Sequence, residues 1–421
     1  MSTAIRAARV LPNSRAEFIQ DGVVVVDSDR ITKVGAWADL KDSHGAAAVK
    51  ELGDATLMPG LFDCHMHLQQ DPSGIATSVH TDLSDEDILA LMAKHASKLL
   101  DAGVTTARDL GAKRMNAIVT REKIAKGEIP GPRVQCANAP LTVPGGHCAA
   151  MGGVCEGVEG VRAEVRKRAS EGANLIKVMS TGGFMTAGSH PSQARFTPEE
   201  MSAIKDEALK FGLPVTTHAT GTQGIDRAAD ANFDSIEHCA WINPDGKAVF
   251  DPVVAQKLVD KNIAVCPTMN TACISQCYFC PWDSRDAIVD NLRKMRAAGV
   301  RLVAGTDAGI GLCRFERYAD GLTVLADAGY TPREIVAAAT EDAAELCGLG
   351  KETGRLEPGL AADLAAFAGN PLEDIANYLQ PRFVMALGRE HKLTPIEPLG
   401  NIKEQADLTF KLLRQGAGLP V

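Results

Sequence analysis

Two histidines two residues apart close an apolar run near the N-terminus. The run reads Leu-Met-Pro-Gly-Leu-Phe-Asp-Cys-His-Met-His-Leu over residues 57–68, so the histidines are His65 and His67. If the run is a strand, residues two apart point to the same side, and the two imidazoles converge on one point. Such a pair suits chelation of a divalent metal. Two unrelated histidines, one of them in the core, are the alternative, but later parts of the chain supply further ligands.

These further candidates stand at equivalent places in other predicted strands. They are Lys177 in Asn-Leu-Ile-Lys-Val-Met-Ser, His218 ending Val-Thr-Thr-His, His238 ending Ser-Ile-Glu-His, and Asp307 ending Val-Ala-Gly-Thr-Asp. In a parallel barrel, chemistry lies where the strands end at their C-terminal side. We therefore expect four histidines, one lysine and one aspartate to share one site.

Lys177 and Asp307 each allow two interpretations. Lys177 lies between Ile176 and Val178, where a lone ammonium is costly to bury, so one interpretation pairs it with a buried acid. In the other, burial near cations lowers its pKa, and the neutral amine takes up carbon dioxide to become a carbamate that bridges two metal ions. Asp307 is either a helix-cap carboxylate or a metal ligand that also carries a proton.

Short apolar strands alternate with longer helical stretches in the middle of the chain, a pattern typical of a parallel sheet. The predicted strands are residues 57–67, 104–110, 133–137, 175–180, 214–218, 235–239, 264–268 and 301–306. The predicted helices include residues 85–102, 158–171, 198–211, 252–261 and 284–298. This pattern predicts an α/β fold with a (β/α)8 TIM barrel over residues 57–353. A doubly wound open sheet is the alternative, but no Gly-x-Gly-x-x-Gly follows the first strand.

The two ends of the chain contain short β-rich segments instead. Residues 1–56 and 354–395 are predicted to pair into one small composite β domain that flanks the barrel. Residues 396–421 form a predicted C-terminal tail with an amphipathic helix over Asn401–Arg414, which docks on the body or on another subunit.

Composition excludes several classes of partner. The chain has 421 residues, a formal net charge of −9 and no dense Lys/Arg block, which argues against nucleic acid and anionic membranes. No apolar run approaches the roughly 18–20 residues of a membrane span, and the start lacks the apolar region of a signal peptide. Eleven cysteines without a secretion signal indicate free thiols and a cytoplasmic location. We expect a small-molecule substrate and consider a homo-oligomer.

Taken together, these motifs resemble those of the amidohydrolase superfamily over nearly the whole chain. The matching pieces are residues 58–67, 175–178, 217–219, 236–238 and 305–309, and the stretches 359–364 and 370–374 are similar to its β-sandwich domain. The resemblance implies a barrel with a composite β-sandwich domain from both termini. It also implies a binuclear metal centre, commonly zinc.

By the same resemblance, six residues are the ligands of two divalent ions. One ion would be held by His65, His67 and Asp307, the second by His218 and His238, with carboxylated Lys177 and a hydroxide bridging them. The hydroxide would attack the substrate carbonyl, and Asp307 would take the proton and deliver it to the leaving amine. Lys177 and Asp307 are thus the predicted catalytic residues.

The subgroup of this superfamily that the sequence resembles limits the type of reaction that is expected. Deaminase-like members lack the bridging lysine and carry a glutamate three residues after the strand-5 histidine, whereas here Gly221 takes that place after His218. The sequence is most similar to the prolidase-like and imidazolonepropionase-related subgroup, whose prolidase-like members cleave amide bonds of dipeptides and N-acyl amino acids. A metal-dependent hydrolase of such an amide is the main hypothesis. The alternatives are a hydrolase of a carbamate, urea or lactone on the same site, and a non-catalytic binding protein.

Three residues in predicted mouth loops are candidates for substrate contact. His147, in the Gly-rich loop after the third strand, would hydrogen-bond the substrate, or else hold a lid. Trp241 would wall the pocket. Arg314 would bind a substrate carboxylate, or else form a surface ion pair with Glu316. The aromatic residues of the loop over residues 268–282 would add an apolar recognition surface or an oligomer contact.

Overall fold

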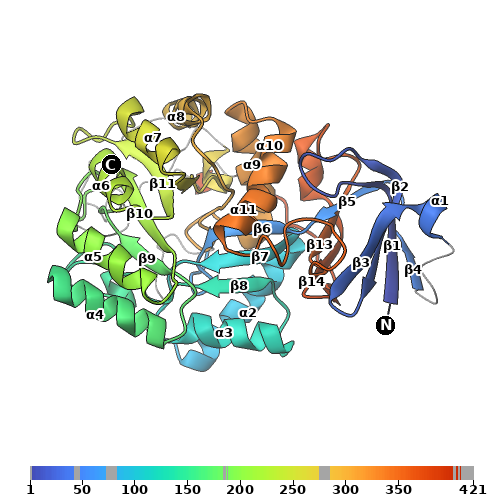
Figure 1. Ribbon diagram of the computed structural model, residues 1–421, viewed down its shortest axis with the longest axis horizontal. Helices are drawn as coiled ribbons and strands as arrows, with labels where there is room; N and C mark the ends of the chain where they lie inside the picture. Colours follow the sequence, from blue (N-terminus) through green and yellow to red (C-terminus); the bar gives the residue numbers. More distant parts are fainter. Residues whose placement is uncertain are drawn as a thin grey trace.

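The computed structural model describes residues 2–41, 48–72, 83–183, 186, 188–274, 285–401, 404, 405 and 408. It has two structurally different ends (Figure 1). The blue strands near the N-terminus and the red-brown strands β13 and β14 lie together in a β-rich part, and the segments between them form parallel strands with helices packed outside. Among the described residues, no helix combines the length and apolar character needed to cross a membrane.

The β-rich part is one sheet built from both termini. Its strands are β1 (Ser2–Val10), β2 (Ile19–Asp27), β3 (Arg30–Ala36), β4 (Ala48–Glu51), β5 (Ala55–Pro59), β13 (Leu364–Ala368), β14 (Pro381–Ala386) and β15 (Arg389–Glu390). They lie in the order β15-β14-β13-β5-β1-β2-β3, with β4 beside β1 and the short helix α1 (Trp37–Leu40) after β3. The expected pairing of the two ends is therefore present, while a sandwich architecture and the exact domain boundaries stay predictions.

The middle of the chain forms two parallel sheets. One holds β6 (Leu61–Met66), β7 (Val104–Asp109) and β8 (Arg133–Cys136), and the other β9 (Ile176–Met179), β10 (Val215–Gly221), β11 (Ser235–Ile242) and β12 (Ala264–Cys266). Isolated parallel bridges pair Leu141 with Val178, Val265 with Leu302, and Met66 with Ala308. These bridges link both sheets and the segment 302–308 into a ring. This segment carries only bridges where residues 301–306 were predicted to form a full strand.

The predicted strand over residues 57–67 is in fact two strands in different sheets. β5 belongs to the terminal sheet and β6 to the parallel one, with Gly60 between them. A Cβ atom at Gly60 would lie 2.0 Å from Oγ1 of Thr105. Because glycine has no side chain, it permits this close approach at the residue where the chain crosses from one sheet to the other. Spacing of apolar residues does not reveal such a crossing, because both strands are buried.

Helices cover the outside of the parallel strands. They are α2 (Asp85–Asp101), α3 (Asn116–Lys126), α4 (Gly157–Ser170), α5 (Pro198–Leu209), α6 (Thr222–Asp230), α7 (Pro252–Asp260), α8 (Arg285–Ala298), α9 (Tyr318–Asp327), α10 (Pro332–Ala339) and α11 (Glu341–Leu346). The five predicted helices correspond to α2, α4, α5, α7 and α8. A capping box of Thr197 and Glu200, followed by proline, starts α5 at the predicted residue.

A buried carboxylate joins α4 to α5. Glu207 of α5 accepts hydrogen bonds from Arg162 and Arg166 of α4 at 3.1 and 3.0 Å, and from Lys210 at 2.7 Å. These partners, Lys210 foremost, lower the pKa of Glu207 to about 2 although burial opposes the shift.

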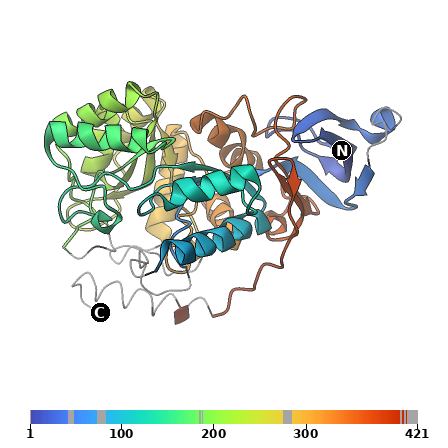
Figure 2. The same ribbon diagram turned by 90° about the horizontal axis from the view of Figure 1, so that it is seen from below.

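The chain after β15 packs along the body and not as a helix up to residue 401 (Figure 2). It is held at α2, where Asp101 accepts hydrogen bonds from Nε2 of His391 and from the backbone nitrogen of Thr394, both at 2.8 Å. The predicted helix over residues 401–414 lies almost wholly outside the described residues.

Candidate active site

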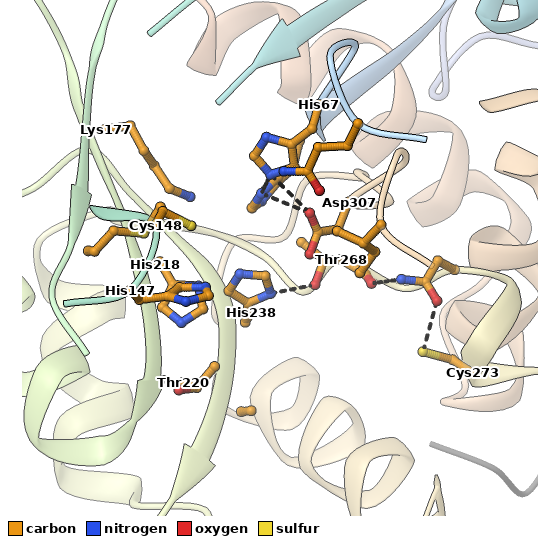
Figure 3. A pocket seen from close by; sticks show the side chains of 16 residues that line it. His67, His147, Cys148, Lys177, His218, Thr220, His238, Thr268, Cys273 and Asp307 are labelled. Carbon is orange, nitrogen blue, oxygen red and sulfur yellow. Dashed lines mark hydrogen bonds and ion pairs between the residues drawn. The ribbon is translucent and has the colours of Figure 1, made fainter. Parts of the chain in front are cut away.

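A cavity of about 80 Å³ opens at the C-terminal ends of the parallel strands (Figure 3). All six residues predicted as metal ligands line it: His65, His67, Lys177, His218, His238 and Asp307. They come from β6, β9, β10, β11 and the loop after residue 306, which are far apart in the sequence. The parallel arrangement brings them together because every strand ends on the same side.

Three of these residues form a compact donor group. Nε2 of His65 lies 3.3 Å from Nε2 of His67, and Oδ1 of Asp307 lies 3.4 and 3.1 Å from these two nitrogens. One ligand atom from each of the three residues lies within 4.8 Å of the others. The two-residue spacing thus places both imidazoles on one side of the chain, as predicted.

The other two histidines and the lysine stand next to this group. The rings of His218 and His238 are 4.4 Å apart, and the ring of His238 is 5.1 Å from that of His65. Lys177 is 1% exposed and extends its amine into the same cavity. In the described part of the chain, the Nζ atom of Lys177 has no hydrogen-bond partner. A buried amine of this kind calls for an anion or for a chemical change that removes its charge.

Each of the four histidines uses one ring nitrogen for a contact with the protein. The contacts are His65 Nδ1 to Glu237 Oε2 at 2.9 Å, His67 Nδ1 to Gly111 O at 3.2 Å, His238 Nδ1 to Thr268 Oγ1 at 2.8 Å, and His218 Nε2 to Gly182 O at 3.0 Å. A ring nitrogen that donates its hydrogen leaves the other nitrogen as an acceptor. With these tautomers, the ring nitrogens that can bind a metal ion are Nδ1 of His218 and Nε2 of His65, His67 and His238.

Electrostatics favours the metal-binding protonation states. Burial lowers the pKa of His65, His218 and His238 well below the usual value, which keeps these rings neutral. Burial also lowers the pKa of Lys177. Although burial opposes it, the neighbouring imidazoles hold the pKa of Asp307 well below its usual range. At His67 burial lowers the pKa, but the adjacent Asp307 carboxylate outweighs it and raises the pKa above its usual value. Three neutral imidazoles, the His67–Asp307 pair and an amine without a hydrogen-bond partner among the described residues together fit a pair of divalent cations.

Left-handed backbone conformations occur at several of these positions. The φ angles of His238, Cys239, Trp241, Thr268 and Asp307 lie between 49° and 70°. Such angles are uncommon outside glycine and cluster at functional sites, where surrounding structure enforces them. In β11 these φ angles break the alternation of a regular strand. Glu237 therefore contacts His65, while the ring of the next residue, His238, lies next to that of His218.

His147 is the predicted substrate-contact residue that the structure places in the cavity. Its ring centroid is 4.8 Å from that of His218, and its Nδ1 is 2.9 Å from Oγ1 of Thr186. Burial lowers the pKa of His147 to about 4, so the ring is neutral near pH 7. Its hydrogen bond to Thr186 is the contact expected of a loop histidine, and Nε2 is left for a ligand.

The prediction that Trp241 walls the cavity is wrong. Its side chain is fully buried and packs on Phe250 with the ring centroids 5.1 Å apart, while Ala240 lines the cavity instead. The irregular backbone of β11 turns the indole away. Arg314 is also absent from the lining formed by the described residues. The predicted loop aromatics Tyr278, Phe279 and Trp282 lie outside the described residues.

The sequence interpretation missed several neutral lining residues. They are Gln70, Cys148, Met179, Thr220, Ala240, Thr268, Asn270, Cys273 and Ile310. It also gave no role to Glu237, whose only sequence signal is its position next to His238. Strand alternation would place Glu237 on the opposite side from His238, which hides it from a pattern search.

Comparisons with known proteins agree with this geometry. The model of the amidohydrolase family matches residues 56–390. Ochratoxinase of Aspergillus niger is 29% identical, over 97% of this chain and 90% of that protein. Its crystal structure superimposes with a TM-score of 0.80 at 28% identity, over 95% of this chain and 98% of that one.

Two further proteins are similar over most of their length. An imidazolonepropionase of Paracoccus denitrificans is 26% identical, over 83% of this chain and 88% of that protein. The crystal structure of an Xaa-Pro dipeptidase with methionine bound in its active site has a TM-score of 0.82 and 26% identity, over 93% of this chain and all of that one.

Proposed function

We propose that this chain, which belongs to the amidohydrolase family, is a metal-dependent hydrolase that cleaves the amide bond of a dipeptide or an N-acyl amino acid. Family membership and relatives named as hydrolases make the chain an amide-bond hydrolase. The substrate class is the proposal. The observation that carries the metal-dependent mechanism is the meeting of four histidines, an aspartate and a lysine in one cavity, with no hydrogen-bond partner for the lysine among the described residues. The apolar part of the cavity wall and the similar dipeptidase support the substrate class. The family and the ring of parallel strands support a (β/α)8 barrel as the scaffold.

The residues present would hold two divalent ions in two adjacent groups. The first group is His65 Nε2, His67 Nε2 and Asp307, and the second is His218 Nδ1 and His238 Nε2, with carboxylated Lys177 shared between them. When bound, the ions would polarise the scissile carbonyl and lower the pKa of the attacking water. Zinc suits this set of nitrogen and oxygen ligands.

The chain's own side chains supply the remaining chemistry. Asp307 lies at the edge of the first group, with Oδ1 3.1 Å from Nε2 of His67, and we assign it the transfer of a proton from water to the leaving amine. Lys177 is buried and has no hydrogen-bond partner in the part of the chain that the structure describes. As the neutral amine it would add carbon dioxide and release one proton to water, which gives its carbamate. Neutral His147 would donate or accept a hydrogen bond at the substrate.

The cavity wall supports a substrate with an apolar side chain. Met179, Ala240 and Ile310 contribute apolar surface next to the histidines. The similar Xaa-Pro dipeptidase holds methionine in its active site, which is an amino acid with an apolar side chain. These two observations support an amino acid product with an apolar side chain.

The test is a substrate screen on zinc-loaded protein. Dipeptides and N-acyl amino acids with apolar side chains are incubated with the protein, and free amino acids are quantified by mass spectrometry. We expect the wild-type protein to release an amino acid. Removal of the metal with a chelator, or the substitution Lys177→Ala, should abolish this release. Release of an alcohol or carbon dioxide from carbamates, with amides untouched, would contradict the proposed substrate class. Wild-type protein that binds no divalent metal would contradict the mechanism itself.

A further inference from the structure

A second buried layer of charged side chains lies behind the candidate ligands. Its centre is Glu237 of β11, which is 0% exposed. Oε2 of Glu237 lies 2.9 Å from Nδ1 of His65. Oε1 accepts hydrogen bonds from Nη2 of Arg108 at 2.8 Å and from Oγ1 of Thr216. The proposed reaction uses neither Glu237 nor Arg108.

Arg108 of β7 ties this carboxylate to the strand that carries the first histidines. Its Nε donates to the backbone oxygen of Cys64 at 2.7 Å, directly before His65, and Nη1 donates to Oγ of Ser235 at 3.4 Å. Arg108 is 3% exposed. A buried carboxylate needs a compensating charge and satisfied oxygens, and Arg108 and Thr216 supply both. The network therefore spans β6, β7, β10 and β11.

His65 differs from the other three histidines in the partner of its ring nitrogen. His67 and His218 contact backbone carbonyl oxygens, and His238 contacts a hydroxyl. At the ring nitrogen that points away from the other candidate ligands, His65 is the one of these four that contacts a carboxylate, whereas Asp307 lies at the opposite nitrogens of His65 and His67. A carboxylate that accepts the ring N–H fixes the tautomer and the ring orientation and makes the opposite nitrogen a stronger ligand.

We infer that Glu237 is a positioning residue that holds His65 with its Nε2 lone pair toward the first metal, and that Arg108 fixes Glu237 in place. This inference rests on the proposed metal centre. His65 lines the cavity, and Glu237 contacts His65 without being among the described lining residues. We therefore expect a change at Glu237 to alter the metal affinity and the ligand field of the metal more than substrate contact.

Glu237→Gln tests the inference, because the amide keeps the size of the side chain and removes its charge. Metal-free protein is titrated with Zn²⁺ against a chromophoric chelator, and the visible spectrum of the Co²⁺ form is recorded. We expect one of the two sites, the one to which His65 contributes, to lose affinity by about 10–100-fold and the Co²⁺ bands to shift. Glu341→Gln is the matched control, since Glu341 is 8% exposed, accepts a hydrogen bond from the backbone of Ser14 at 3.0 Å and lies outside the cavity lining.

Glu237→Asp is the second variant if the glutamine variant does not fold. It keeps the charge but shortens the reach, so Nδ1 of His65 and Arg108 can no longer be contacted together. Weakened metal binding in either folded variant, with wild-type affinity in Glu341→Gln, supports the role of Glu237. Wild-type affinity and an unchanged Co²⁺ spectrum in the folded Glu237 variants overturn it, while the metal centre stands. Wild-type protein that binds no divalent metal overturns both.

Discussion

Asp307→Asn isolates the proton-transfer role from metal binding. Asparagine has the shape of aspartate and keeps a carbonyl oxygen where Oδ1 now lies 3.1 Å from Nε2 of His67 and 3.4 Å from Nε2 of His65. It cannot accept a proton as a carboxylate does. The two histidines of the first group and the whole second group stay unchanged, so metal content should stay nearly intact.

The size of the expected effect follows from the role that Asp307 would lose. General acid–base catalysis by one positioned side chain contributes about 10²–10⁴-fold to the rate. At 1.36 kcal/mol for each factor of ten, this equals about 2.7–5.4 kcal/mol of activation free energy. We therefore expect kcat to fall by about 10²–10⁴-fold, with a much smaller change in KM.

The assay compares kcat, KM and metal content of the zinc-loaded proteins on one amide substrate found by the screen. Asp101→Asn is the control, because Asp101 is also a buried aspartate, 1% exposed, and lies far from the cavity lining. It should keep wild-type kcat even if the C-terminal segment that it holds becomes looser. A kcat for Asp307→Asn within about fivefold of wild type, at full metal content, would refute the proton-transfer role.

Three further changes probe the ligand bridge, the strand crossing and an ion-paired carboxylate. Lys177→Ala should reduce the metal content from two ions toward one per chain, and added acetate should restore part of the activity; full metal content without acetate would contradict a bridging role. Gly60→Ala should destabilise the fold by about 1–3 kcal/mol, because its Cβ would meet Thr105, whereas Gly160→Ala, in open space on a helix, should not; thermal unfolding measures both. Glu207→Gln should lower stability at neutral pH. The folded-state pKa of Glu207 is lowered to about 2, so its contribution to the free energy of unfolding is full above the pKa of glutamate in the unfolded chain and is lost as pH falls toward 2. In urea unfolding at a series of pH values, the stability of the variant should therefore fall less steeply on acidification than that of the wild type. Equal slopes of stability against pH in the acid range would contradict this prediction.

The ligands could be predicted from sequence because their signals are local. The spacing of His65 and His67 follows from the period of an extended chain, and the remaining ligands lie within or directly after short apolar strand segments. Parallel strands then place all of these ends on one side without any further information. Five helices were also predicted, since their caps and apolar spacing lie within the helix itself.

The sequence predictions that were wrong or incomplete depend on contacts between distant parts of the chain. Trp241 sits in a left-handed stretch of β11, and no residue pattern announces that its side chain turns into the core. The crossing at Gly60 depends on Thr105, a contact between strands more than forty positions apart. Glu237 was overlooked because a regular strand would face it away from the site. In each case the deciding contact joins distant segments, which composition and periodicity do not encode.

The position of β5 between β1 and β13 also bears on the order in which the protein assembles. Ala55 of β5 pairs with Ala368 of β13, and the chain runs from β5 across one residue into β6, the strand that carries His65. Pairings between such distant residues form slowly, because a long loop must close before they gain any contact. During synthesis, the neighbour that completes the sheet around β5 is made only when most of the chain exists. β5, which leads directly into the strand that carries His65, therefore gains its second neighbour late, although it is among the first strands to be made.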